Sequence, residues 1–104
     1  MVDARSLLRS IEGRTLHTVT GCENRVLRVD SKSVLVWTRK SPCGQPVPLK
    51  WVQNALDRLE QDGEIEISTA SVGFRSAFIG AVLLELPGAR SVRTTSPPRI
   101  RLPR

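Results

Sequence analysis

The stretch "WTRKSPCGQPVPLKWVQN", residues 37–54, joins the end of a β-branched segment to the start of an amphipathic helix. Pro42, Pro46 and Pro48 donate no backbone hydrogen bond, so this stretch cannot continue a central strand. The sequence therefore predicts a rigid connection between a strand and a helix. Pro48 suits the first turn of that helix, where its missing N–H would be unpaired anyway.

After this connection, the chain alternates between helical and extended patterns. Apolar residues recur at helical spacing up to a stop at Gly63, namely Leu49, Val52, Ala55, Leu56 and Leu59. "EIEIS" (64–68) alternates Glu and Ile as in a half-buried strand. "FRSAFIGAVLLEL" (74–86) is apolar nearly all round, which predicts a buried helix ended by Pro87 and Gly88.

Before the connection, a short helix and a hairpin are expected. Asp3 is a typical N-cap, helical spacing of apolar residues follows it, and Gly13 is a stop. "RVLRV" (25–29) and "VLVWT" (34–38) are β-branched runs joined by the turn-forming "DSKS". The predicted fold is a small single-domain α+β protein, winged-helix-like, with a β-hairpin preceding the central helix. It spans 1–89, and the Pro/Arg-rich segment 90–104 is predicted to be a linker or extended arm.

The chain is basic, but its charge is uneven. Its 104 residues suit one domain, and 16 Lys and Arg against 10 Asp and Glu give a net charge of +6. The charge sums to +4 over residues 1–47, −3 over 48–70 and +5 over 71–104. A basic surface built from both ends of the chain favours a polyanionic partner.

The residues that catalysis or metal binding needs are scarce. The chain has one histidine, His17, and two cysteines, Cys22 and Cys43, so neither a four-cysteine zinc set nor one of two cysteines and two histidines can be completed. The carboxylates of 57–66 alternate with apolar positions, as on a solvated surface. We therefore expect no enzyme, no metal and no cofactor. We also expect no membrane span and a cytoplasmic location, where the two thiols are more often separate than paired.

The candidate binding residues are basic side chains at the ends of predicted elements, where helix N-termini and tight loops already favour anions. These candidate phosphate contacts are Arg25, Arg39, Lys40, Lys50 and Arg75. The candidate base or backbone contacts are Gln53, Asn54 and Ser76, because amide side chains form bidentate contacts with adenine. Trp37 and Trp51 are predicted to pack in the core rather than to stack on a base.

Residues 13–89 resemble the N-terminal module that precedes the HNH nuclease domain in McrA-like, modification-dependent restriction endonucleases. The resemblance lies in "TG" with "NR" at 20–25, in "SPCGQPVP" at 41–48 and in "RSAFIGAV" at 75–82. The resemblance implies a module that binds double-stranded DNA, modified or unmodified, and delivers a C-terminal nuclease domain to it. The HNH histidines and a zinc-binding cysteine set are absent from this sequence, so any nuclease would lie outside it.

Other functions stay open at this point. The same fold can serve as a protein-interaction or dimerisation module in which the charge gives solubility. An RNA-binding module and a winged-helix transcription regulator are further alternatives. The residues do not indicate whether a base methyl, a hydroxymethyl or a phosphorothioate would be recognised.

Overall fold

The computed structural model describes residues 3–18, 21–68, 75–92 and 97–103. These residues form three helices and two antiparallel sheets, so the α+β class predicted from the sequence is confirmed. In chain order the elements are α1 (Ala4–Ser10), β1 (Thr15–His17), β2 (Glu23–Val29), β3 (Ser33–Thr38), β4 (Ser41–Pro48), α2 (Leu49–Asp62), β5 (Glu64–Glu66), α4 (Ser76–Leu83), β6 (Arg90–Val92) and β7 (Arg99–Arg101).

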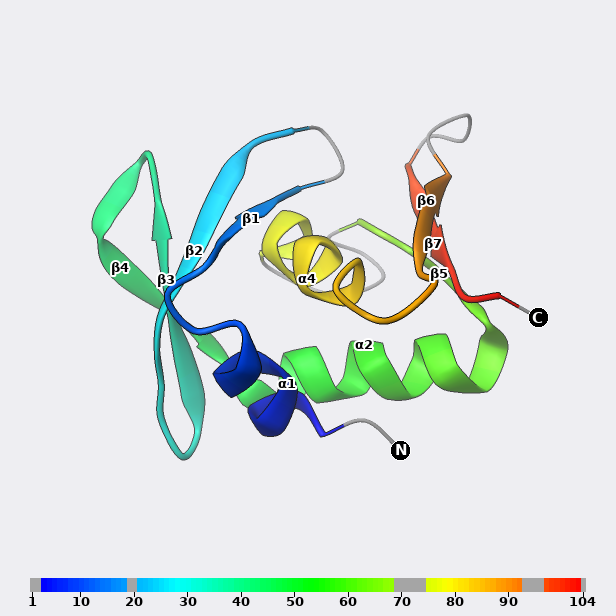
Figure 1. The fold of residues 1–104 in the computed structure, drawn as a ribbon, viewed down its shortest axis with the longest axis horizontal. Coiled ribbons are helices and arrows are strands. Elements are labelled where there is room, and N and C mark those ends of the chain that lie inside the picture. The colour runs from blue at the N-terminus through cyan, green and yellow to red at the C-terminus, as the bar shows by residue number, and fades with distance from the viewer. Residues whose placement is uncertain (1–2, 19–20, 69–74, 93–96, 104) are drawn as a thin grey trace.

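The larger sheet has the strand order β1-β2-β3-β4. The predicted hairpin is its centre, with Val26 opposite Val36 and Val29 opposite Val34. The valines of β2, β3 and β4 face the helices and are buried, and Val26 and Val29 share this face because the β2–β3 register shifts between Val26 and Arg28. Figure 1 shows all three helices on one side of this sheet.

The stretch that begins with Ser41 forms strand β4, so the prediction of a plain connection is wrong. Pro46 lies opposite Leu35 and Pro48 opposite Ser33 in the ladder. The prolines are tolerated because β4 is at the edge of the sheet and has one neighbour only. Gly44 has a φ of 95°, and a Cβ there would lie 2.7 Å from Cγ of Leu35, so the strand can bend here only with glycine.

Helix α2 ends where the sequence predicts, but Pro48 lies just before its first turn and not within it. Pro48 precedes its first residue, and Gly63 ends it in a left-handed conformation, with its N–H donating to the carbonyl of Leu59 at 2.7 Å. Val52, Ala55, Leu56 and Leu59 form the buried face of the helix.

Helix α4 is the centre of the core, although it is shorter than predicted and ends at Leu83. Residues 78–83 are all buried. Gly80 allows Ile67 to approach closely, because a Cβ on Gly80 would lie 3.1 Å from Cγ2 of Ile67. Figure 1 shows α4 between the larger sheet, α2 and the smaller sheet, which accounts for the burial of most of its residues.

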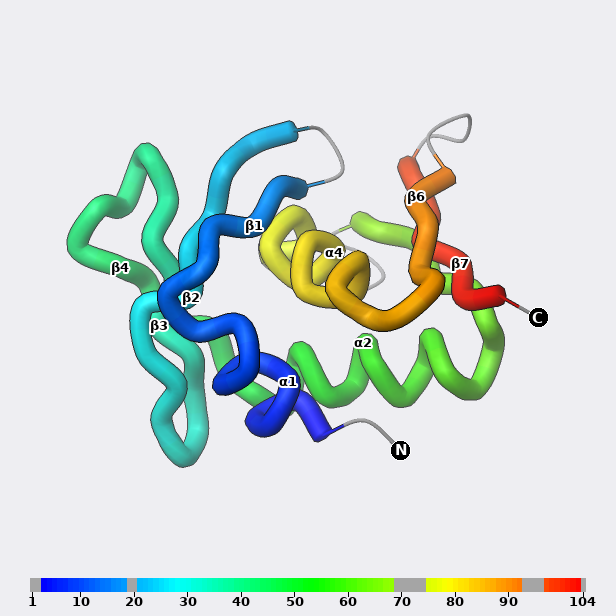
Figure 2. The backbone as a smooth tube through the Cα atoms, in the orientation of Figure 1, coloured from blue at the N-terminus to red at the C-terminus, as the bar shows by residue number. Residues whose placement is uncertain are grey.

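The C-terminal segment forms the smaller sheet, with strand order β5-β7-β6. Ile100 is fully buried opposite Ile65, while Arg99 and Arg101 form ion pairs with Glu64. The expectation of a linker or arm with little to bury is therefore wrong for this part of 90–104. A three-residue "RIR" strand is too short to be recognised as a pattern; one of its partners, β5, lies 35 residues away and the other, β6, is equally short. Figure 2 follows the chain to this end of the molecule, away from the larger sheet.

A candidate nucleic-acid interface

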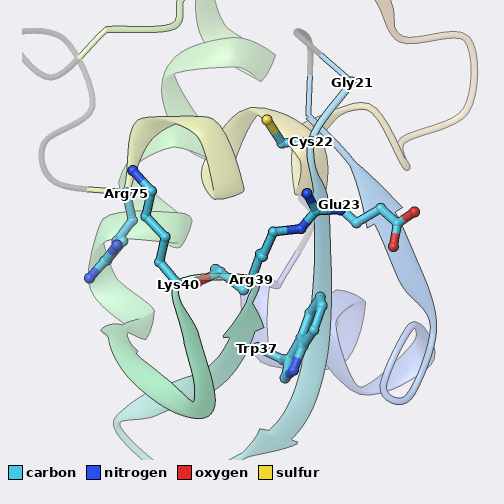
Figure 3. A pocket seen from close by; sticks show the side chains of 8 residues that line it. Gly21, Cys22, Glu23, Trp37, Arg39, Lys40 and Arg75 are labelled. Atoms are coloured by element: carbon cyan, nitrogen blue, oxygen red, sulfur yellow. The ribbon is translucent and has the colours of Figure 1, made fainter.

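A pocket of about 520 Å³ opens where two strand ends of the larger sheet meet the start of α4. The start of β2 contributes Gly21, Cys22 and Glu23, the end of β3 contributes Trp37 and Thr38, and the turn that follows contributes Arg39 and Lys40. Arg75 completes the lining from the residue before α4. Figure 3 shows Lys40 and Arg75 on one side, with Arg39 extending across the pocket and Trp37 below it.

The described lining of the pocket is rich in positive charge. Three of its eight lining residues are cations, and Glu23 is its one carboxylate. Figure 3 shows the Glu23 side chain pointing away from Lys40 and Arg75. Within the described part of the chain, salt bridges engage Arg14, Arg28, Arg99 and Arg101, but none engages the three pocket cations. Unpaired cations around a concave surface attract anions.

Arg39 and Lys40 lie in a tight two-residue turn between β3 and β4. Thr38 lies opposite Ser41, and the Thr38 Oγ1 accepts a hydrogen bond from the Ser41 N–H at 3.1 Å. The turn is thereby closed by both the ladder and a side chain. Two cations on such a turn lose less entropy on binding an anion than cations on a flexible segment.

Arg75 has the most unusual backbone of the pocket residues. Its φ of 66° and ψ of 30° place it in the left-handed region, and among the described residues it is the one non-glycine with positive φ. This conformation costs an L-residue roughly 1–2 kcal/mol. Strained residues of this kind are concentrated at functional sites. Its carbonyl accepts from the Ile79 N–H at 3.0 Å, which ties the strained residue to α4.

Trp37 is half-buried and lines the pocket, and it is absent from the residues packed against the core. The prediction that it packs in the core is wrong, whereas Trp51 does pack against the core as predicted. The guanidinium of Arg25 lies over the Trp37 ring, 5.8 Å from its centroid. The Nε and Nη2 of Arg25 donate to the Thr15 Oγ1 at 3.4 Å, so Arg25 links β1 to the indole.

The structure brings together three of the predicted phosphate contacts, namely Arg39, Lys40 and Arg75, and places Arg25 beside them through Trp37. Ser76 is half-buried and follows Arg75 in the chain. Lys50 and Asn54 are exposed on α2 and do not line the pocket.

Gln53 has internal partners that a base contact would have to break. Its Oε1 accepts from the Ala4 N–H at 2.7 Å, and its Nε2 donates to the Asp57 Oδ1 at 2.9 Å. The amide therefore fixes α1 to α2. The sequence predicted a DNA contact for Gln53 because it lies off the apolar stripe of its helix. That stripe does not show that α1 packs against the same side chain.

Five described pocket residues were not among the predicted contacts, namely Gly21, Cys22, Glu23, Trp37 and Thr38. One signal for Trp37 was present: Val34 and Val36 alternate with it in β3, so it must face away from the core. Cys22 and Cys43 are both exposed and are not joined by a disulfide.

Comparisons with models of known protein families, with curated proteins and with solved structures found no significant match. Among the described residues there is no group of three or more His, Cys, Asp and Glu side chains that could hold a metal ion. No helix within the described ranges is long and apolar enough to cross a membrane.

Proposed function

We propose that the protein is a non-catalytic module that binds double-stranded DNA through the rim of this pocket. One observation carries the proposal: Arg39, Lys40 and Arg75 come from two distant parts of the chain and meet at one concave site, and no described carboxylate forms a salt bridge with them. Cations that the fold brings close together repel one another, and a bound anion offsets this repulsion. The spaced phosphates of a DNA backbone supply such anions.

The fold and the family belong to this proposal as well. The order of α2, β5 and α4, followed by the β6–β7 hairpin, supports a winged-helix-like domain. The McrA-like resemblance adds a biological setting, in which the module recognises modified DNA for a C-terminal HNH nuclease. The chain alone would then bind DNA without cutting it.

The experiment is a titration of labelled duplex DNA at several salt concentrations with two matched triple variants. The first replaces Arg39, Lys40 and Arg75 with alanine. The second replaces Arg5, Arg9 and Arg90, which are exposed outside the pocket, and so removes the same charge. Each lost phosphate contact lowers the slope of log K against log salt by about 0.9.

We expect the pocket variant to lose a slope of about 3 and most of its affinity, and the control variant to bind nearly as the natural protein does. Equal losses in both variants would mean diffuse attraction without a site. No binding of the natural protein to any duplex at low salt would refute the proposal. In that case the interaction-module alternative would be tested by measuring mass against protein concentration.

A further inference from the structure

The pocket is larger and less uniform than a phosphate site requires. Its volume of about 520 Å³ is within the range of roughly 300–1,000 Å³ typical of small-molecule sites. A phosphate held by Lys40 and Arg75 would leave the Trp37 side unfilled, because Trp37 reaches the pocket from β3 and Arg75 from the start of α4. The lining therefore fits a ligand with an anionic part and a planar apolar part.

We propose that the pocket receives one unpaired nucleotide of a DNA duplex, with its phosphate on Lys40 and Arg75 and its base stacked on Trp37. This inference rests on the proposed function and names the part of the DNA that the pocket binds. A nucleotide has the required anionic and planar parts, and every base can stack on an aromatic ring. A base in a regular duplex is enclosed in the helical stack, so the nucleotide must be unpaired or displaced.

The indole is held in position before any ligand arrives. Arg25 contacts the Trp37 ring at 5.8 Å and is itself anchored to Thr15 of the neighbouring strand. A fixed ring loses little conformational entropy when a base stacks on it. Arg25 is thus a positioning residue for Trp37, and its replacement should weaken the contact with the base without removing the phosphate contacts.

The test compares three duplexes of identical length and sequence. The first is fully paired, the second carries one central unpaired nucleotide, and the third has an abasic residue at that central position. A single strand of the same sequence is the fourth ligand. Dissociation constants are measured by fluorescence anisotropy for the natural protein, Trp37→Ala, Trp37→Phe and the control Trp51→Phe.

We expect the natural protein to bind the duplex with the unpaired nucleotide roughly tenfold more tightly than the paired and abasic duplexes, the scale of one base stacked on an aromatic ring. Trp37→Ala should remove this preference while its affinity for the paired duplex changes less than twofold. Trp37→Phe should retain most of the preference, and Trp51→Phe all of it. A 2-aminopurine at the unpaired position should change its fluorescence on binding only when residue 37 is aromatic.

Equal affinity for the paired and unpaired duplexes would overturn this inference while leaving the proposed function intact. A preference that persists in Trp37→Ala would place the base elsewhere and overturn it too. Tighter binding to the single strand than to the unpaired duplex would show that a duplex is not required, against the inference as stated. Absence of binding to all four ligands would refute the proposed function as well. Trp37 lies outside the packed core, and circular dichroism of each variant checks the fold.

Discussion

At the scale of single residues, Arg75 connects backbone strain to the candidate site. Its left-handed conformation is one that glycine adopts without cost, yet the sequence has arginine there. The side chain lines the pocket on the same side as Lys40. We infer that the strained backbone at Arg75 lowers the free energy of unfolding, and that this residue is retained because its side chain lines the pocket.

Replacing Arg75 with glycine tests this inference. Arg75→Gly removes a strain of roughly 1–2 kcal/mol, but the greater freedom of glycine in the unfolded chain offsets part of that gain. We expect the free energy of unfolding to stay level or rise by up to about 1 kcal/mol, and the affinity for DNA to fall. Urea denaturation and a DNA titration on one preparation measure both quantities. A clearly destabilised variant with normal DNA binding would contradict the inference.

Gln53 shows the opposite case, a polar residue with a structural role. Removing its side chain leaves the Ala4 N–H, which is buried, without its 2.7 Å partner. Gln53→Ala should therefore lower the free energy of unfolding by about 1–2 kcal/mol and leave DNA affinity unchanged. Asn54→Ala, on the exposed side of the same helix, is the control and should change neither. Weaker DNA binding by Gln53→Ala at unchanged stability would restore its predicted role as a base contact.

At the scale of elements, the helices and strands with a strong local sequence pattern were predictable. The strands that form only by pairing with other strands were not. The helix with its stop at Gly63 and the hairpin of β2 and β3 follow from spacing and turn residues alone. Strand β4 was missed because proline is excluded from a central strand but accepted at an edge. Strands β6 and β7 were missed because three residues give no usable period.

The sequence predicted some residues of the candidate site but not which of them meet in space. Basic residues at element ends indicated Arg39, Lys40 and Arg75, and the structure brings these three together. The sequence could not separate them from Lys50, because that requires knowing which ends of the elements meet in space. Trp37 was assigned to the core because aromatic residues are usually buried, although its position beside the inward-facing Val36 placed it on the other face.

The C-terminal strand gives a test at this scale. Ile100 is fully buried between β5 and β6, so β7 contributes to the core. Ile100→Ala should destabilise the protein by about 2–4 kcal/mol, whereas Ser91→Ala on the exposed part of β6 should cost little. Thermal and urea unfolding give the comparison. Equal stability of the two variants would mean that this segment behaves as the linker first expected.

At the scale of the whole molecule, the smaller sheet and the pocket differ in how their cations are paired. The carboxylate of Glu64 is neutralised locally by Arg99 and Arg101 in the smaller sheet. The turn after β3 and the start of α4 carry Arg39, Lys40 and Arg75, which form no salt bridge within the described part of the chain. Figure 1 shows the larger and the smaller sheet on opposite sides of α4.

Lys40 and Lys50 test the central claim most directly, because they stand at the two ends of one stretch and only Lys40 lines the pocket. Both side chains are exposed, so neither Lys40→Ala nor Lys50→Ala should alter the melting temperature. The measurement is the dissociation constant of each variant for one duplex at one salt concentration. We predict that Lys40→Ala weakens binding by about 1 kcal/mol, or roughly fivefold, and that Lys50→Ala changes it less than twofold. Equal losses in the two variants, or a loss in Lys50→Ala alone, would contradict the pocket as the DNA-binding site.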